Sequence, residues 1–460
     1  MPGLRRIAVI DVGKTNAKVV LVDAETGEES GLSTAPTIVR RDGPYPHFDV
    51  ARTWDILCDS LAAMRRAGAI DAISTIAHGS AGAFLSGAAD GDGLALPILD
   101  YEHDGPDELA AEYDAARPPF SETLSPRLPG GLNLGAQICW QERRFPAAFA
   151  AAAHYVNYPQ YWTWRLSGVA ATEMCSMGAH SDLWRPRTLT WSSMPARLGW
   201  AAKMAPLRSA FDRWPLLPEL ARRLGLDAAT PVLCGLHDSS ASLLPHLKQR
   251  QPPFTVVSTG TWVILFAVGG GIENLKPERD TLANVTAYGD AVPVGRFMGG
   301  REFDLLTAGD PAVASAADIK RVLAEQIMAL PTFVPGVGPF PAARGRWSVD
   351  SAGLSPGERN AAASFYLALV TAESIRCAGG RGPVVIEGPF ARNHLFCSAL
   401  SAIGRYPVER SETSTGTTPG GALLATADMA KRHFPPKPVA PFNHAGLASY
   451  VEAWRRAAGA

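Results

Sequence analysis

Apolar and polar positions near the start of the chain predict a β-hairpin, and a weaker copy of it lies in the second half. Residues 7–23 form a β-branched apolar run, a turn of small polar residues with glycine, and a second apolar strand. Residues 254–268 repeat this plan, with Gly260 in the place of Gly13. Because such tips expose backbone N–H groups and hydroxyls without side-chain bulk, they suit phosphate oxygens. Two tips facing each other would hold a polyphosphate from both sides.

Between and after the hairpins, the apolar spacing predicts alternating helices and strands. Residues 50–67 have helical spacing that places Trp54, Leu57 and Leu61 on one face. Further helices are expected at 135–144, 158–166, 360–378 and 417–430, and further strands at 72–77, 231–234 and 382–387. This alternation predicts an α/β fold with mixed sheets flanked by helices.

The length of the chain, 460 residues, is too great for a single core. A seam is expected near 231–253, which ends in a Gln- and Pro-rich break, so we predict domains over 1–245 and 246–460. Because the two halves follow a similar plan, we expect a ligand site in a cleft between them.

The charge and the cysteines narrow the class of protein. A net charge of −1 gives no electrostatic argument for a nucleic acid or an anionic membrane as partner. The six cysteines lie far apart without a CxxC pair, which is typical of reduced, buried residues in a cytoplasmic protein. The start of the chain does not read as a signal peptide. No GxxxxGK(S/T) or GxSxG pattern is present, which argues against a P-loop enzyme and a serine triad.

The motif Asp11-x-Gly13-x-Thr15 is the first candidate for ligand chemistry. Asp and Gly are common in plain turns, but this turn follows a first strand and has a counterpart at 258–261. We therefore interpret it as phosphate-binding, with Asp11 suited to a hydrated Mg²⁺. Lys14 is either a further phosphate contact or a solvated turn lysine. Since only the first tip carries an Asp, the pair of tips indicates a nucleotide-dependent phosphotransferase.

Asp238 is the second candidate, and two roles are open for it. It precedes the helical sequence SSASLLPHL and suits a helix cap. As a general base, it would accept the proton of an attacking hydroxyl during in-line phosphoryl transfer. A capping Asp that faces a ligand can do both.

Other polar and glycine-rich segments are ambiguous. The strand ending at Gly388 would let a flat ring approach the backbone, yet a plain strand-to-helix turn has the same composition. Gly420 and Gly421 suit either a ligand contact or tight helix packing. The polar loop at 100–104 lacks the spacing of a metal site. The aromatic run at 158–164 is interpreted as the core face of a helix.

Taken in chain order, these motifs resemble the FGGY carbohydrate kinase family, in the actin/hexokinase/Hsp70 superfamily. The resemblance spans nearly the whole chain and implies two actin-like (ribonuclease H-like) domains. It rests on residues 7–18 and 258–262 for the phosphate loops, 132–146 and 162–172 for two further family segments, 235–238 for the catalytic-base turn, and 388–393 for the adenosine segment. The turns at 235–238 and 258–262 are most similar to those of L-fuculose and L-rhamnulose kinases.

The resemblance implies ATP- and Mg²⁺-dependent phosphorylation of a hydroxyl of a sugar or polyol. It also implies sugar and phosphate binding in the domain at 1–245 and ATP binding in the domain at 246–460. Asp238 would be the base, and Asp11 would bind Mg²⁺ through water. The implied ATP and phosphate contacts are Gly13, Lys14, Thr15, Asn16, Ser258, Thr259, Gly260, Thr261, Gly388, Pro389 and Asn393. Domain closure would exclude water, which is a competing phosphoryl acceptor.

Departures from the family pattern concern the sugar. The turn at 77–84 is small and neutral apart from His78, Gln137 stands where the family has Lys, and Glu173 stands where Asp is common. Such changes can move the preference to another sugar, and we expect a ketose or deoxyketose. The expected sugar contacts are His78, Asp100, Glu102, Glu173 and Asp238.

Two other classes of protein remain as alternatives. A catalytically silent nucleotide-binding regulator on the same fold would have no chemical need for both Asp11 and Asp238. A chaperone-like ATPase would need a separate peptide-binding domain and a linker. We therefore predict a cytoplasmic kinase whose partner is a small-molecule sugar, with a homodimer as an option.

Overall fold

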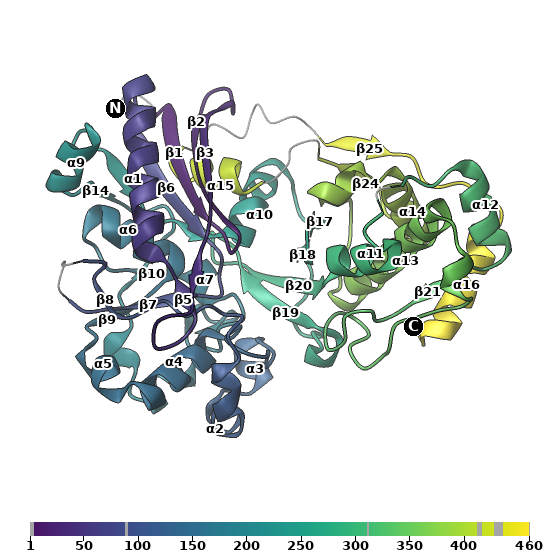
Figure 1. Cartoon of the computed structure of the whole chain (residues 1–460), viewed down its shortest axis with the longest axis horizontal. Helices are drawn as coiled ribbons and strands as arrows, with labels where there is room; N and C mark the ends of the chain where they lie inside the picture. The colour runs from purple at the N-terminus through teal and green to yellow at the C-terminus, as the bar shows by residue number, and fades with distance from the viewer. Residues whose placement is uncertain (1–3, 88–90, 311, 412–415, 427–435, 460) are drawn as a thin grey trace. The chain divides into compact units, whose positions relative to one another are not determined.

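The computed structural model describes residues 4–87, 91–310, 312–411, 416–426 and 436–459. The chain forms two compact units, whose elements are drawn in Figure 1. The first unit comprises Met1–Gln249, Ala283–Ala291 and Gly416–His433, and the second comprises Arg250–Leu282, Val292–Thr415 and Phe434–Ala460.

The main sheet of the first unit contains β1 (Arg6–Val12), β2 (Asn16–Asp23), β3 (Glu29–Pro36), β6 (Ala72–Ala77), β14 (Arg213–Pro215), β15 (Pro231–Leu233) and β16 (Leu236–His237). The strand order is β14-β15-β6-β1-β2-β3, and β16 also pairs with β6. Strand β6 is parallel to β1, β15 and β16, whereas β1, β2 and β3 are antiparallel neighbours. The sheet is therefore mixed, as the sequence predicts.

Both faces of this sheet are buried. Ala8, Ile10 and Val12 of β1 belong to one hydrophobic core, whereas Ile7 and Val9 belong to the core on the other face. Successive strand residues point to opposite faces, so a continuous apolar run indicates a strand covered on both sides. Residues of α1 (Val50–Ala67) and α6 (Tyr158–Ser167) join the first core, and residues of α10 (Asp238–Gln249) and α15 (Thr417–Leu423) join the second.

A smaller sheet in the first unit has the order β8-β7-β9. Its strands are β7 (Gly82–Leu85), β8 (Leu94–Leu96) and β9 (His154–Asn157). The remaining α-helices of the unit are α2 (Ala110–Ala116), α3 (Phe120–Thr123), α4 (Leu134–Arg144), α5 (Pro146–Ala151), α7 (Met174–Met177), α8 (Ser193–Arg197) and α9 (Pro218–Leu224). The aromatic run lies in α6, where Tyr158, Tyr161 and Trp162 are 0% exposed, which confirms its interpretation as a core face.

Two-residue strands complete the first unit. They are β4 (Val39–Arg40), β5 (His47–Phe48), β10 (Thr172–Glu173), β11 (Trp184–Arg185), β12 (Thr190–Trp191) and β13 (Leu207–Arg208). They pair as β4 with β5, β10 with β13, and β11 with β12.

A seven-stranded sheet that lies mostly in the second unit has the order β19-β20-β18-β17-β23-β24-β25, and residues 283–285 of β19 and 291 of β20 are assigned to the first unit. These strands are β17 (Phe254–Thr259), β18 (Val263–Val268), β19 (Thr281–Val285), β20 (Ala291–Phe297), β23 (Val384–Glu387), β24 (Val408–Arg410) and β25 (Lys437–Val439). The short pair is β21 (Ala329–Leu330) and β22 (Arg346–Trp347). The helices are α11 (Gly299–Thr307), α12 (Ala316–Ala324), α13 (Pro356–Cys377), α14 (His394–Gly404) and α16 (Leu447–Ala458).

The long helix α13 begins four residues earlier than the spacing predicts. Its start is set by a capping box, in which Ser355 accepts from the N–H of Glu358 and the Glu358 carboxylate accepts from the N–H of Ser355. Most of its residues are buried on every side, so apolar periodicity alone marks its ends poorly.

The predicted internal repeat is present in the pairing of the strands. In the first unit β1 is antiparallel to β2 and parallel to β6, and in the second unit β17 is antiparallel to β18 and parallel to β23. The tips differ in length, because Gly13 donates its N–H to the carbonyl of Asn16, whereas Gly260 donates to Trp262.

Each of the two units is made of several separate stretches of the chain. The first boundary, after Gln249, lies close to the predicted domain end at residue 245, but Ala283–Ala291 and Gly416–His433 return to the first unit. The predicted division of sugar and ATP binding between two domains stays a prediction.

Tight glycine packing explains why α15 returns to the first unit. A Cβ added to Gly420 would lie 1.9 Å from the carbonyl oxygen of Ala241 in α10, and one added to Gly421 would lie 2.6 Å from the side chain of Ile76 in β6. This supports the packing interpretation of these glycines. The helix ends at Leu423, and the predicted continuation from residue 427 lies outside the described residues.

Among the described residues, no helix has the length and apolar character needed to cross a membrane.

Gly235 allows β15 and β16 to pair with the same strand, β6. Its φ is +78°, and an added Cβ would lie 2.2 Å from the carbonyl oxygen of Thr75. We expect Gly235→Ala to lower the free energy of unfolding by about 2–5 kcal/mol, from backbone strain and overpacking together. Thermal and urea unfolding measure this loss.

Gly199→Ala is the matched control for that variant. Gly199 has a φ of +75°, but an added Cβ would meet no atom within 4 Å. Gly199→Ala should therefore lower the free energy of unfolding only through backbone strain. Equal unfolding free energies for the two variants would contradict the close approach at Gly235.

Candidate functional site

Three parallel strands bring predicted site residues of the first unit to one edge of its sheet. Asp11 of β1 pairs with Ile76 of β6, and His237 of β16 pairs with Ala77 of β6. His78 and Asp238 are the residues that follow β6 and β16. Because parallel strands end on the same edge, that edge is where open α/β sheets bind ligands.

Asp238 is the first residue of α10, and its carboxylate has partners on both sides in the chain. Its Oδ1 accepts from the N–H of Ser239 at 2.6 Å and lies 3.1 Å from Nε2 of His237. Burial raises the pKa of Asp238, but the hydrogen bond and electrostatic attraction of His237, together with His78 and the N–H of Ser239, outweigh burial, so the pKa lies below its ordinary value. The side chain is 30% exposed, and an ionised, partly exposed carboxylate is what a general base requires.

His237 supports Asp238, a role that sequence reasoning did not assign. Its ring is buried against Gly79, where an added Cβ would lie 2.6 Å from the ring. Its Nδ1 has no hydrogen-bond partner among the described residues, whereas Nε2 meets Asp238. The only signal for this role in the sequence is adjacency to Asp238.

Asp11 is buried beside a lysine. Its Oδ2 lies 3.1 Å from Nζ of Lys18. Burial raises the pKa of Asp11, Lys18 opposes the rise, and the negative charge of Asp238 adds to it. The hydroxyl of Thr417, at the start of α15, also hydrogen-bonds to it. Two carboxylates therefore act on one another at this edge, and a bound cation would relieve their repulsion.

His78 is 7% exposed and lies among aromatic rings. Its ring centroid is 5.2 Å from those of Phe48 and Tyr101 and 4.9 Å from that of Tyr158. Neither ring nitrogen has a partner among the described residues. Burial lowers the pKa of His78 to about 4, against the attraction of Asp238. His78 is thus a neutral imidazole that can donate one hydrogen bond and accept another.

Lys14 connects the first hairpin tip to the predicted acidic loop. Its Nζ forms an ion pair with Asp100 and lies 3.3 Å from Oε2 of Glu102. It also lies 4.9 Å from the ring centroid of Tyr101 and 5.3 Å from that of Phe48. The structure thus brings two predicted sugar contacts, Asp100 and Glu102, to this lysine. The predicted contact between Lys14 and phosphate stays a prediction.

In the rest of the first tip, the side chains are exposed and the backbone is held by hydrogen bonds. Thr37 donates its N–H to the carbonyl of Thr15 and its hydroxyl to the carbonyl of Gly13, both at 2.9 Å. The side chains of Thr15 and Asn16 are exposed. The predicted phosphate loop therefore presents these side chains from a fixed backbone.

The second tip, at 258–261, is joined to the turn that follows β23. The Thr259 hydroxyl donates to the carbonyl oxygen of Glu387 and accepts from the N–H of Phe390 at 3.1 Å. This hydroxyl therefore serves packing within the second unit, which the sequence motif does not reveal. The other residues of the tip keep accessible surface: Ser258, Gly260 and Thr261.

The predicted adenosine segment lines a cavity. Gly388 has a φ of +80°, and an added Cβ would lie 2.1 Å from the carbonyl oxygen of Thr259, so the turn requires glycine. Asn393 caps α14 by accepting from the N–H of Phe396 at 2.9 Å. Pro389 and Asn393 both line a cavity of about 640 Å³ in the second unit, a volume that suits a ligand of nucleoside size.

Glu173 is placed differently from the other predicted sugar contacts. It is 0% exposed, and its carboxylate accepts from the N–H groups of Cys175 at 2.9 Å and Ser176 at 3.1 Å. It is therefore the N-cap of α7. Its contact with a sugar stays a prediction that this geometry does not favour.

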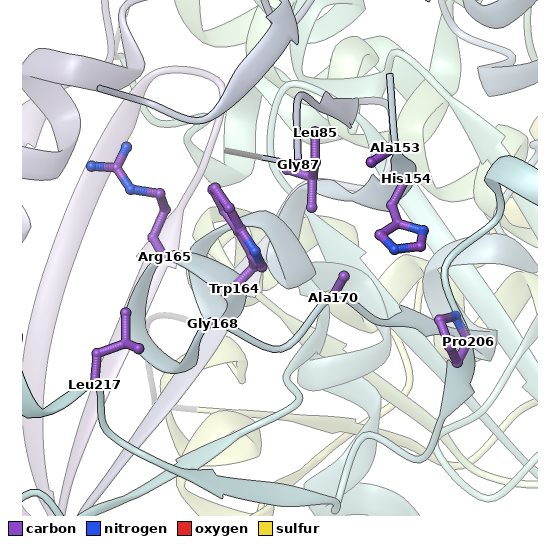
Figure 2. A pocket seen from close by; sticks show the side chains of 10 residues that line it. All are labelled: Leu85, Gly87, Ala153, His154, Trp164, Arg165, Gly168, Ala170, Pro206 and Leu217. Atoms are coloured by element: carbon purple, nitrogen blue, oxygen red, sulfur yellow. The ribbon is translucent and has the colours of Figure 1, made fainter. Parts of the chain in front are cut away.

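A separate cavity of about 690 Å³ lies in the first unit and is lined by none of the predicted site residues (Figure 2). His154, Trp164 and Arg165 contribute its larger polar and aromatic side chains. In Figure 2, Trp164 lies between His154 and Arg165, whose side chains do not point toward one another. Polar groups thus do not converge here as they do in specific binding sites.

Similarities to known proteins extend over the whole chain. Residues 251–433 match the family of the C-terminal domain of the carbohydrate kinase FGGY. A carbohydrate kinase from Novosphingobium aromaticivorans is 34% identical, with a TM-score of 0.89 over 98% of this chain and 100% of that one. A ligand-bound xylulose kinase from Lactobacillus acidophilus has a TM-score of 0.81 over 99% of each chain. At 16% identity, it shows the shared fold alone.

Among curated proteins, an L-fuculokinase from Salmonella typhi is 24% identical over 283 residues. The matched stretch covers 58% of this chain and 57% of the fuculokinase, so the chain matches little more than half of that relative's length. Together the structural similarities confirm the predicted α/β actin-like fold.

His78 should make the stability of the protein depend on pH. The unfolded imidazole has a pKa near 6.5, and the folded one has a pKa of about 4. Between these values the unfolded chain binds a proton that the folded chain does not, so stability should fall as the pH is lowered. The full loss is about 3 kcal/mol.

Urea unfolding of the wild type and His78→Phe from about pH 7 to about pH 4 isolates this effect. The stability of the wild type relative to the variant should decrease as the pH falls, because phenylalanine cannot titrate. A difference that is constant with pH would contradict the assignment. NMR titration of the His78 ring gives the pKa directly.

Proposed function

Because the chain belongs to the FGGY carbohydrate kinase family, we propose that it transfers the γ-phosphoryl group of ATP to a hydroxyl group of a sugar. The observation that carries this proposal is the convergence of Asp11, His78 and Asp238 at one edge of the first sheet. Phosphoryl transfer to an alcohol needs a group that accepts the hydroxyl proton and a group that serves the metal ion of ATP. Asp238 can accept the proton and Asp11 can serve the metal ion, and both lie at this edge.

Asp238 is the proposed base. As the substrate oxygen attacks the γ-phosphorus in line, the hydroxyl proton passes to the Asp238 carboxylate. The bond from the γ-phosphorus to the bridging oxygen breaks, and ADP leaves with that oxygen. His237 supports this role, because its hydrogen bond orients the carboxylate and keeps its pKa low, so that the group is charged before transfer.

The residues at this edge also fit Mg²⁺. Proteins usually hold this ion with one or two carboxylates, water and substrate phosphates, and Asp11 supplies one carboxylate whose charge is disfavoured by burial and by the nearby Asp238. Within the described part of the chain, no group of three or more His, Cys, Asp or Glu could hold a metal ion. When bound, Mg²⁺ neutralises charge on the β- and γ-phosphates.

The remaining contacts are proposed within each unit. In the first unit, the exposed side chains of Thr15 and Asn16 suit phosphate oxygens. In the second unit, the tip at 258–261 suits phosphate, and the cavity beside Pro389 and Asn393 suits the nucleoside.

A ketose or deoxyketose is the proposed class of sugar. The partial similarity to an L-fuculokinase supports it. The turn His237-Asp238 adds support, because it resembles the corresponding turn of fuculose and rhamnulose kinases.

Asp238→Asn should abolish turnover without abolishing nucleotide binding. The amide keeps the size of the side chain but cannot accept the proton, so we expect sugar-dependent ADP formation to fall about 10²–10⁴-fold. ADP release across a panel of ketoses, aldoses and polyols measures turnover, and calorimetry measures ATP affinity.

The matched control is Asp227→Asn, in an exposed turn where the carboxylate accepts from the N–H of Ala229. It should keep full activity. A fully active Asp238→Asn would remove Asp238 as the base. A wild type that binds ATP but phosphorylates no sugar would instead indicate a catalytically silent regulator.

Asp11→Asn should weaken the use of Mg²⁺. Loss of one charged ligand should raise the Mg²⁺ concentration for half-maximal rate about 10- to 100-fold, with little change in the KM for sugar. The rate is measured against Mg²⁺ at fixed ATP. Asp23→Asn, which loses only a pair with Arg5, is the control and should leave this dependence unchanged. An unaltered Mg²⁺ requirement in Asp11→Asn would contradict the assignment.

A further inference from the structure

We propose that Lys14 and Asp100 belong to the sugar subsite, where their ammonium and carboxylate hydrogen-bond to hydroxyl groups of a neutral, polyhydroxylated substrate. The inference rests on the proposed kinase function and deepens it. It names the chemical class of the substrate, and it assigns Lys14 to the sugar instead of to the phosphates of ATP.

The position of the Lys14 ammonium is the first argument. Its Nζ is held by Asp100, whose side chain is 4% exposed, and by Glu102, whose side chain is 65% exposed. The lysine side chain is itself 22% exposed, so it is neither a solvated turn lysine nor fully enclosed. Lys18, rather than Lys14, is the lysine beside Asp11. The cation at the metal-binding carboxylate is therefore a different residue.

The walls around the ion pair are aromatic and include an unsatisfied histidine. The rings of Tyr101 and Phe48, which lie under the ammonium, also pack on His78. His78 is 7% exposed, and both of its ring nitrogens lack partners among the described residues. Buried polar atoms are ordinarily hydrogen-bonded, so these groups are arranged for a ligand. Aromatic walls with a few fixed polar groups are typical of small-molecule sites.

The same group of residues lies within electrostatic reach of the proposed base. The charges of Asp238 and Asp100 both act on His78, and both act on Tyr101. Because His78 and Asp238 follow the paired strands β6 and β16, a substrate bound through one hydroxyl to Lys14 and Asp100 can present another hydroxyl to Asp238.

The charges indicate a neutral substrate. Lys14 faces two carboxylates, Asp100 and Glu102, so the local charge is negative before Asp238 is counted. A sugar acid or sugar phosphate would be repelled. Each hydroxyl of a neutral sugar can donate to a carboxylate and accept from an ammonium, so it matches this pair. A site that hydrogen-bonds a hydroxyl also rejects analogues that lack it.

Lys14→Met tests the proposal, because methionine keeps apolar bulk but removes the donor and the charge. With the sugar that the wild type prefers, we expect the KM for sugar to rise about 10- to 100-fold, as for the loss of one hydrogen bond to a charged group. The KM for ATP should not change. The wild type should not phosphorylate D-gluconate, a sugar acid. ADP release is measured with each substrate varied in turn.

Lys203→Met is the matched control. Its Nζ lies 5.2 Å from the ring centroid of Phe149 and donates to the carbonyls of Ala150 and Ala152, so the same substitution removes a similar contact outside the site. Neither KM should change in it. Asp100→Asn, which keeps the side-chain shape, should also raise the KM for sugar and gives a second reading if Lys14→Met does not fold.

Three results would overturn the inference: a rise in the KM for ATP with an unchanged KM for sugar, no change in either, or efficient turnover of D-gluconate. Calorimetry of sugar binding separates the inference from the kinase proposal. If the wild type binds a neutral sugar but makes no ADP, and Lys14→Met no longer binds that sugar, the results would support the inference and contradict the proposed function. A wild type that binds no neutral sugar would overturn the inference.

Discussion

The parallel register of β1, β6 and β16 is the constraint on which the candidate site depends. It places Asp11 opposite Ile76 and His237 opposite Ala77, so that the residues following β6 and β16 reach the same edge as Asp11. A shift of one residue would turn every side chain of a strand to the other face. Because β1 is buried on both faces, each face is filled by a fixed set of apolar side chains, and packing specifies the register.

The same strand plan carries different chemistry in the second unit. There Ser258 of β17 pairs with Glu387 of β23, and Gly388 follows at the end of the strand. The first unit places Asp11, His78 and Asp238 at this edge of its sheet, whereas the second places the hydroxyl of Ser258 at the corresponding edge, beside the buried Glu387 and a glycine that requires close backbone approach. The repeat thus supplies two similar frameworks, and the residues at the strand ends distinguish the site proposed for proton transfer and metal from the one proposed for phosphate and nucleoside.

The sequence predicts what is local and misses what depends on distant packing. Both hairpins, the core face of α6 and the position of Asp238 at the start of a helix follow from residue patterns within a few positions. The partner of Lys14 does not, because Asp100 lies 86 residues away. The hydroxyl of Thr259 and the carboxylate of Glu173 have suitable chemistry for ligands, yet both already form hydrogen bonds with backbone groups. Motifs identify residue types, whereas the tertiary fold decides which of them have atoms left for a ligand.

The different pKa directions of Asp11 and Asp238 need a cause beyond burial, because burial raises the pKa of both. Neighbouring carboxylates in one environment tend to share a proton, and an enzyme assigns distinct roles by giving them different partners. Here the hydrogen bond from His237 lowers the pKa of Asp238, whereas Lys18 does not fully offset the burial of Asp11. His237 in turn is buried against Gly79, where a Cβ would meet its ring. The low pKa of the proposed base therefore depends on the close packing of His237 against a glycine that has no proposed role in the chemistry.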